Sequence, residues 1–74
     1  MLPNKVVSIA DSVIWKMPYI LDEVKRTDIS VEALYEIVCS KFDDISEFIL
    51  CLDTLYLLNK INFDKKYEVL QYVN

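Results

Sequence analysis

Few side chains of this chain have the types and spacing that chemistry requires. The two cysteines, Cys39 and Cys51, lie in apolar helical surroundings without a CxxC spacing, and the chain contains no His. A metal site or a redox pair needs more ligands than these, so we expect two buried free thiols. The adjacent acids Asp43 and Asp44 are better explained by helix capping than by acid–base catalysis or metal binding. Without a Gly-rich loop or a large core, the sequence predicts no catalytic residue, no metal, no cofactor and no enzyme activity.

The elements that would position these residues must fit into one small domain. The chain has 74 residues, and we expect a single domain over residues 1–74 with one hydrophobic core. Its apolar content of 54% is high for this length, so we expect part of the apolar surface to lie at an interface. No segment approaches the ~20 apolar residues of a membrane span, and the first residues lack the apolar core of a signal peptide. The expected protein is cytoplasmic and has no membrane partner.

The first part of the chain predicts an arm and one helix. Residues 1–9 contain a short β-prone segment and are expected to form an N-terminal arm or an edge strand. A helix is predicted over residues 11–25, where the apolar residues at helical spacing are Ile14, Met17, Leu21 and Val24, with Trp15 and Tyr19 to one side. Because Pro18 removes one helical hydrogen bond, this helix either bends or begins there.

A second helix is predicted over residues 31–40. Ser30 has a side chain suited to an N-cap, and Glu32 is favourable in the first helical turn. The spacing of Leu34, Ile37 and Val38 predicts that these three residues face the core.

A third helix and a hairpin complete the predicted fold. Asp44 and Glu47 have the spacing of a capping box at the start of a helix over residues 45–59. Two β-prone runs follow, at residues 61–63 and 67–73, and the polar residues 64–66 form a turn between them. The order of three helices and then a hairpin predicts a mainly α, winged-helix-like fold, in which the hairpin is the wing.

The third helix would hold the DNA-reading position of a winged helix, yet it suits a protein partner better. Its core stripe is predicted to contain Ile45, Phe48, Leu52, Leu55 and Tyr56, with Ile49, Leu58 and Ile61 toward the hairpin. The opposite face consists of Glu47, Leu50, Asp53, Thr54 and Leu57. Residues 44–59 include three acids but no Lys or Arg, so this helix would repel a phosphate backbone. We therefore predict that the opposite face docks a protein.

Other interpretations of these surfaces stay open. Leu50 and Leu57 would also be explained by cover from the N-terminal arm or by simple exposure, since single surface leucines are common. The docking surface would alternatively lie around Trp15 and Tyr19 or at the hairpin edge over residues 67–73. The more ordinary interpretation of Trp15, Tyr19 and Tyr35 is that they are core or half-core aromatics. The basic residues Lys60, Lys65 and Lys66 are better explained as solubilising charge on the wing than as phosphate contacts.

Three segments give the chain a family resemblance. They are the opening LPNK at residues 2–5, ISVEALY at residues 29–35 and FILCLDTLYLLNKI at residues 48–61. Together they resemble the middle components of bacterial ABC-three-component systems, small subunits encoded between an SMC-like ABC ATPase and a third, effector-type component. The family often has Gly where Asn59 stands, and Asn is the usual substitute at a left-handed position.

The resemblance implies a non-catalytic adaptor that joins the SMC-like ATPase to the effector subunit in defence against phage or plasmids. Winged-helix domains that dock on SMC-type ATPase heads, as in kleisins, make this role reasonable by analogy of fold. Nucleic acid would be contacted only indirectly, through the complex. The alternative is a small winged-helix transcriptional regulator or antitoxin that binds DNA. A third interpretation is a stand-alone phage or plasmid protein that forms a homodimer through its apolar excess.

Overall fold

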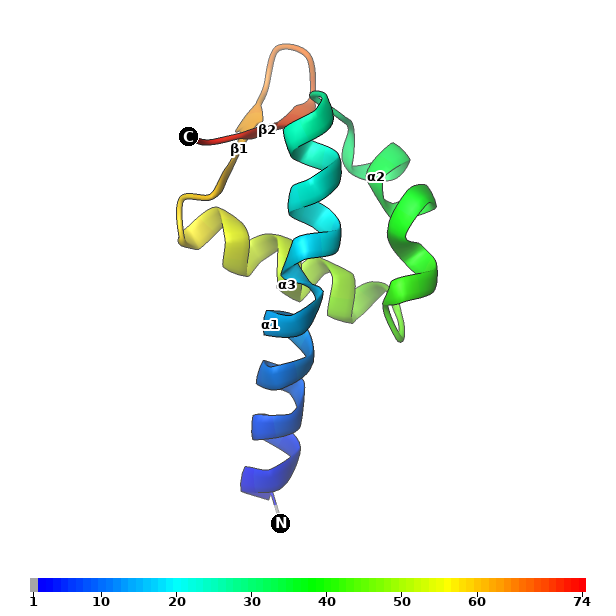
Figure 1. The fold of residues 1–74 in the computed structure, drawn as a ribbon, viewed down its shortest axis with the longest axis vertical. Helices are drawn as coiled ribbons and strands as arrows, with labels where there is room; N and C mark the ends of the chain where they lie inside the picture. The colour runs from blue at the N-terminus through cyan, green and yellow to red at the C-terminus, as the bar shows by residue number, and fades with distance from the viewer. Residues whose placement is uncertain (1) are drawn as a thin grey trace.

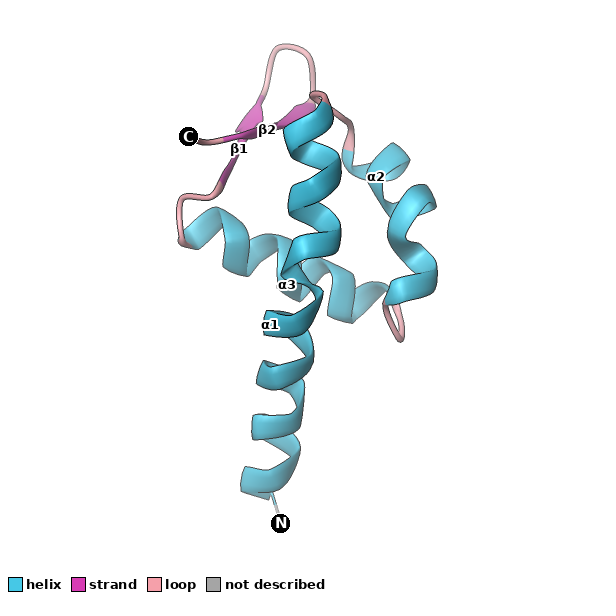
Figure 2. Cartoon of the chain, viewed as in Figure 1, coloured by secondary structure: helices cyan, strands magenta, loops and turns pink. Residues whose placement is uncertain are grey.

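The computed structural model describes residues 2–74, with side chains from residue 11 onward. In chain order the elements are α1 (Leu2–Arg26), α2 (Val31–Val38), the short 3-10 helix η1 (Cys39–Lys41), α3 (Ile45–Leu57), β1 (Ile61–Asp64) and β2 (Val69–Tyr72). α1 crosses α3, α2 lies beside both, and the two strands pair above them (Figures 1 and 2). Three helices followed by an antiparallel hairpin confirm the mainly α, winged-helix-like fold class.

The N-terminal segment differs from the prediction. Residues 2–9 are the first turns of α1 and not an extended arm or an edge strand. A strand needs a partner for its backbone groups, whereas a helix satisfies them within the segment. Pro3 is tolerated because the first turn of a helix does not use its N–H groups. α1 also continues through Pro18, so the helix does not begin at that residue.

α1 is rotated relative to the predicted stripe. Val13, Ile20 and Val24 are buried, while Met17 and Leu21 pack against the core from its margin. Ile14 was predicted to face the core, yet 58% of it is exposed. The positions adjacent to the predicted stripe are also apolar, so the periodicity alone fits more than one rotation.

Both predicted N-caps are confirmed, but the Glu47 carboxylate accepts from the backbone N–H of Asp43 and not from that of Asp44, as a capping box requires. Ser30 Oγ accepts a hydrogen bond from Ala33 N–H at 3.1 Å, and α2 begins at the next residue. Asp44 accepts in the same way from Glu47 N–H at 2.9 Å at the start of α3. Of the three residues predicted to be buried by the second helix, Leu34 and Val38 are buried and Ile37 is exposed.

The core lies where the three helices and the hairpin meet. It consists of Val13, Ile20, Val24, Leu34, Val38, Phe42, Phe48, Cys51, Leu52, Leu55, Ile61 and Leu70. Phe48 is at its centre, with the rings of Tyr35 and Phe42 at centroid distances of 4.8 and 5.5 Å. The structure thus buries Phe48, Leu52, Leu55 and Ile61 as predicted, but the remaining members of the predicted stripe, Ile45, Ile49, Tyr56 and Leu58, are exposed.

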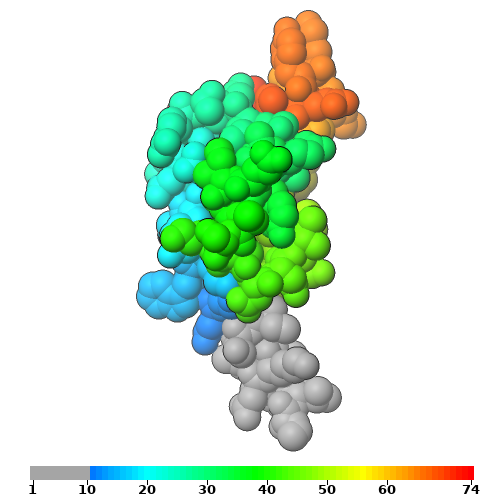
Figure 3. Space-filling model, turned by 90° about the vertical axis from the view of Figure 1, so that its right-hand side faces the viewer, coloured from blue at the N-terminus to red at the C-terminus, as the bar shows by residue number. Residues whose placement is uncertain are grey.

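The hairpin forms the wing. β1 and β2 pair with Phe63 opposite Leu70, and the register places Ile61, Phe63, Leu70 and Tyr72 on one face. Asn59 has the left-handed φ of 62° that the comparison with Gly suggested, and Glu68 has one of 57°. The tip of the hairpin protrudes beyond the helical body (Figure 3). Among the described residues, no helix has both the length and the apolar character needed to cross a bilayer.

Candidate protein-docking surfaces

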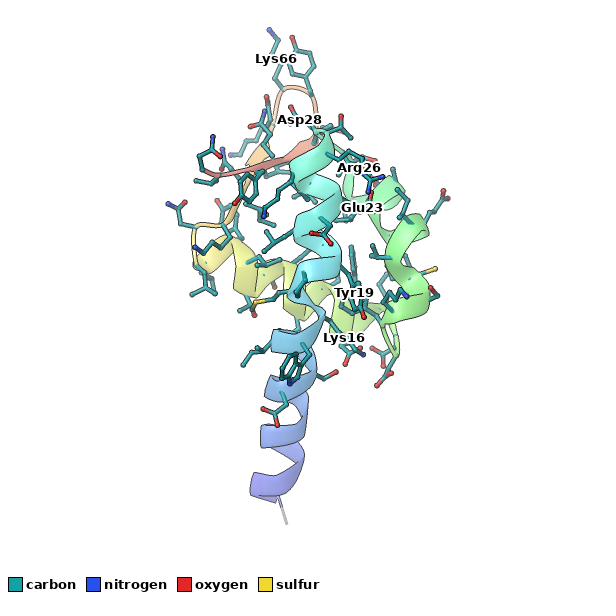
Figure 4. The ribbon with its side chains drawn as sticks, in the orientation of Figure 1. Lys16, Tyr19, Glu23, Arg26, Asp28 and Lys66 are labelled. Atoms are coloured by element: carbon teal, nitrogen blue, oxygen red, sulfur yellow. The ribbon has the colours of Figure 1, made fainter. Side chains whose placement is uncertain are left out.

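The side chain of Glu47 links α1 to α3. Its carboxylate accepts hydrogen bonds from Ser12 Oγ, from Lys16 Nζ at 2.6 Å and from the backbone N–H of Asp43 at 2.8 Å. Lys16 Nζ also lies 3.7 Å from Asp43 Oδ1. Figure 4 shows Lys16 and Tyr19 on the side of α1 that faces α2. Glu47 therefore does not lie on an outward face with Leu50 and Leu57, as we had predicted, because two donors from α1 hold it against that helix.

This cluster shifts the titration of both charged groups. The pKa of Glu47 is lowered from its ordinary 4.5 to about 2, first by the hydrogen bond from Lys16 and then by the one from Ser12. The pKa of Lys16 is raised, chiefly by its hydrogen bond to Glu47. Both groups are therefore charged at neutral pH, and the pair links the two helices electrostatically.

The other residues of the predicted docking face do point outward. Leu57 is 81% exposed, Leu50 is 43% exposed, and Asp53 is exposed between them. Thr54 is half-buried and donates its hydroxyl to the Leu50 carbonyl at 2.7 Å, a contact within the helix. We call Leu50, Asp53 and Leu57 the α3 outer face. It carries two large apolar side chains and one acidic side chain, and it contains no Lys or Arg.

A second exposed apolar surface lies on α1. Trp15 is 77% exposed, and Ile14 and Pro18 are exposed beside it. The interpretation of Trp15 as a core or half-core aromatic is therefore wrong. Tyr19 is exposed too, but the Lys41 ammonium lies 5.2 Å from its ring centroid and covers it on the α2 side. We call Ile14, Trp15 and Pro18 the α1 patch.

A third surface was missed by the sequence reasoning. A groove of about 250 Å³ lies between α3 and the hairpin, and its lining residues are Val31, Ile49, Leu52, Asp53, Tyr56, Ile61, Phe63 and Leu70. The sequence signal that would have indicated this groove is the spacing of Ile49 and Tyr56, which are seven positions apart on α3, together with Phe63 on the inner face of β1. Both α3 residues had been assigned to the core. We call this surface the α3–hairpin groove.

The thiols and acids are not arranged for chemistry. Cys51 is buried, its Sγ lies 3.6 Å from the Val13 carbonyl, and burial raises its pKa to about 11. Cys39 is exposed, contrary to the prediction that both thiols are buried. Among the described residues, no cluster of three or more His, Cys, Asp or Glu could hold a metal ion.

The basic residues lie mainly away from α3. Lys65 and Lys66 are exposed at the hairpin tip, where Lys66 lies 5.3 Å from the ring centroid of Tyr67 (Figure 4). Lys60 is exposed in the connection that follows α3. α3 itself contains no Lys or Arg, so a phosphate backbone laid along α3 would meet no cation from that helix.

Comparison with known proteins gives one match. Neither a curated protein nor a solved structure matches the chain. A family model, described as ABC-three component (ABC-3C) system Middle Component 7, matches residues 2–70. The match includes all three helices, the first strand and the start of the second, so the α1 patch, the α3 outer face and the α3–hairpin groove lie within the matched segment. The chain is therefore a member of the MC7 family, the middle components of ABC-three component systems.

Proposed function

We propose that this chain is a non-catalytic adaptor that bridges an SMC-like ABC ATPase and an effector component in a complex that defends against phage or plasmids. The family description supports a place in a multi-component system. The observation that carries the adaptor role is the presence of two exposed apolar surfaces, the α1 patch and the α3 outer face. An adaptor needs two surfaces that are available at the same time.

The two surfaces point in different directions. α1 and α3 pack against each other through Val13, Cys51 and the Glu47 cluster. Because side chains advance by about 100° per helical residue, Trp15 lies on the far side of α1 from Val13, and Leu57 lies about 120° around α3 from Cys51. One partner could therefore contact the α1 patch while another contacts the α3 outer face.

The charges favour protein partners over nucleic acid. The chain has 8 basic and 12 acidic residues, and Asp53 lies within the α3 outer face. A DNA-binding helix takes much of its affinity from Lys and Arg, which α3 lacks. In the proposed complex the subunit contributes contacts and no reaction, and any contact with DNA is made by its partners.

Co-expression with the ATPase and the third component tests the proposal. All three proteins are expected to purify together through a tag on any one of them. Trp15→Asp is expected to detach one partner, and Leu50→Lys with Leu57→Lys is expected to detach the other, since each change places a charge in a desolvated apolar contact. Circular dichroism should show both variants folded, because these side chains are exposed.

Matched controls place charges elsewhere on the surface. Glu36→Lys alone, and Glu36→Lys with Ser40→Lys, change exposed residues near α2 that lie outside both surfaces, and both should leave the complex intact. Loss of the same partner from both test variants would show one shared interface instead of a bridge. Recovery of the parent chain without either partner, as a monomer or a homodimer, would refute the adaptor role.

A further inference from the structure

The hairpin has one occupied edge and one open edge. On the outer side of β2, Leu70 N–H donates to the Ile29 carbonyl at 2.7 Å, and Ile29 N–H donates to the Leu70 carbonyl at 3.2 Å. The backbone of Leu70 therefore points away from β1. In an antiparallel pair, the residue opposite must then point its own backbone groups away as well. That residue is Phe63, whose N–H and C=O thus lie on the outer edge of β1.

The same alternation applies along β1. Val73 N–H donates to the Lys60 carbonyl at 3.0 Å, so Lys60 and Val73 form a hydrogen-bonded pair. Such pairs alternate along the two strands with pairs that are not hydrogen-bonded, and Ile61 and Phe63 belong to the pairs that are not. Ile61 and Phe63 therefore point their N–H and C=O groups away from β2, but only 1% of Ile61 is exposed, so it is Phe63 that presents these two groups to solvent. No described residue pairs with this edge. The sequence had suggested residues 67–73 as the exposed edge, but the bridge to Ile29 occupies that side of the sheet at Leu70.

The open edge and the α3–hairpin groove share residues. Phe63 forms the open edge with its backbone, and Ile61 and Phe63 line the groove with their side chains, facing Ile49 and Tyr56 of α3. The groove volume of about 250 Å³ is below the ~300–1,000 Å³ of typical small-molecule sites. A strand added beside β1 would point every second side chain toward the side of the sheet that faces α3.

Charge defines the occupant further. Asp53 lines the groove, is exposed and has no ion-pair partner among the described residues. A basic side chain on the incoming segment would complement it. A second copy of β1 would not do so, because residues 61–64 contain no Lys or Arg.

We propose that β1 accepts an extended segment of a partner protein as a third strand, with alternate apolar side chains in the α3–hairpin groove and a Lys or Arg facing Asp53. This mode of recognition takes affinity from main-chain hydrogen bonds and specificity from the groove. The inference rests on the proposed function, since it names the kind of partner segment that the adaptor binds.

Short overlapping synthetic peptides that cover the ATPase and the third component test this mode. A peptide with alternating apolar residues and a basic residue is expected to bind the intact chain. Its backbone can be N-methylated at every second residue in two ways, on the odd or on the even positions. Methylation of the positions whose N–H groups face β1 should abolish binding, and methylation of the other positions should have little effect. Equal loss of binding from both sets of methylations would overturn strand addition.

Two pairs of variants test the residues on this chain. Phe63→Ala and Phe63→Pro both remove the ring, but only Phe63→Pro removes the outward N–H, so it should bind the peptide about tenfold more weakly than Phe63→Ala. Proline is tolerated where an edge N–H faces solvent. Asp53→Lys should weaken binding by about fivefold, whereas Asp22→Lys on α1 should not change it.

The outcomes separate this inference from the proposed function. If the intact partners co-purify but no peptide binds, or if Phe63→Pro binds as Phe63→Ala does, strand addition is wrong and the adaptor role stands. If a peptide binds but the intact partners never co-purify, the strand site stands and the adaptor role is wrong. Dimerisation of the chain that Phe63→Pro abolishes would show that a second copy occupies the edge, and would also overturn the inference.

Discussion

Lys16 Nζ lies 2.6 Å from Glu47 Oε1, which joins the middle of α1 to the first turn of α3 across 31 positions of sequence. Only 19% of the Lys16 side chain and 12% of the Glu47 side chain are exposed, so water screens this pair less than an open surface pair. This contact links the helix that carries the α1 patch to the helix that carries the α3 outer face.

The Glu47 cluster predicts how stability depends on pH. The pKa of Glu47 is about 2 in the folded chain, whereas its ordinary value is 4.5. The contribution of Glu47 to the free energy of unfolding is therefore fully present above about pH 4.5 and is lost as pH falls toward 2. Glu47→Gln should lower the free energy of unfolding at neutral pH by roughly 1–2 kcal/mol after screening by solvent. Urea titrations between neutral pH and pH 2 should show a smaller acid-dependent loss in this variant. The exposed Glu36→Gln is the control, and a parent-like pH profile for Glu47→Gln would contradict the prediction.

Two leucines of α3 offer a matched test of the core. Leu55 is 1% exposed and Leu57 lies on the outer face two residues later. Truncation of a buried leucine to Ala costs ~2–5 kcal/mol, whereas exposed positions usually change stability by less than ~0.5 kcal/mol. Thermal unfolding should therefore show a large loss for Leu55→Ala and almost none for Leu57→Ala. Similar transitions for the two variants would mean that α3 is rotated differently.

The two cysteines should differ in reactivity. Cys39 is exposed, while Cys51 is buried and burial raises its pKa to about 11. The thiolate is the reactive form of a cysteine, so Cys51 should react slowly even at alkaline pH in the folded chain. A thiol reagent should modify one site per chain under native conditions and two in denaturant. Cys39→Ser should abolish the native reaction, and rapid labelling of that variant would show that Cys51 is accessible.

The isolated chain should bind duplex DNA weakly. α3 contains two acids and no base, and its N-cap is a third acid. Non-specific binders reach a Kd of ~10⁻⁴ to 10⁻⁶ M by neutralising phosphates, and this chain should be weaker at physiological salt. A salt-dependent gel shift at low micromolar protein would favour the regulator or antitoxin instead. Lys65→Glu with Lys66→Glu would then show whether the wing is responsible.

Features that depend on nearby residues could be predicted from the sequence. The N-caps at Ser30 and Asp44 act on backbone groups three residues away. Asn59 takes its left-handed conformation at the end of the third helix, and the turn residues separate two strands that pair directly. These interactions form within a few residues of chain, so the type and order of most elements follow from local sequence.

The rotation of the helices was decided by tertiary structure. Apolar residues occupy more than one side of both α1 and α3, so periodicity did not distinguish Val13 from Ile14 or Cys51 from Tyr56 as core residues. The helix over residues 2–9 was missed for a similar reason, because β-prone residues form a strand only where a partner strand is available.

The surfaces were partly determined by sequence and partly by the fold. The lack of Lys and Arg in the third helix follows from the sequence alone, since residue types do not depend on folding. Three other features join segments that are far apart in the chain. They are the ion pair that removes Glu47 from the predicted docking face, the bridge from Ile29 that closes one edge of the hairpin, and the groove beside the open edge. Such contacts form only when the core brings those segments together, so the sequence by itself could not specify them.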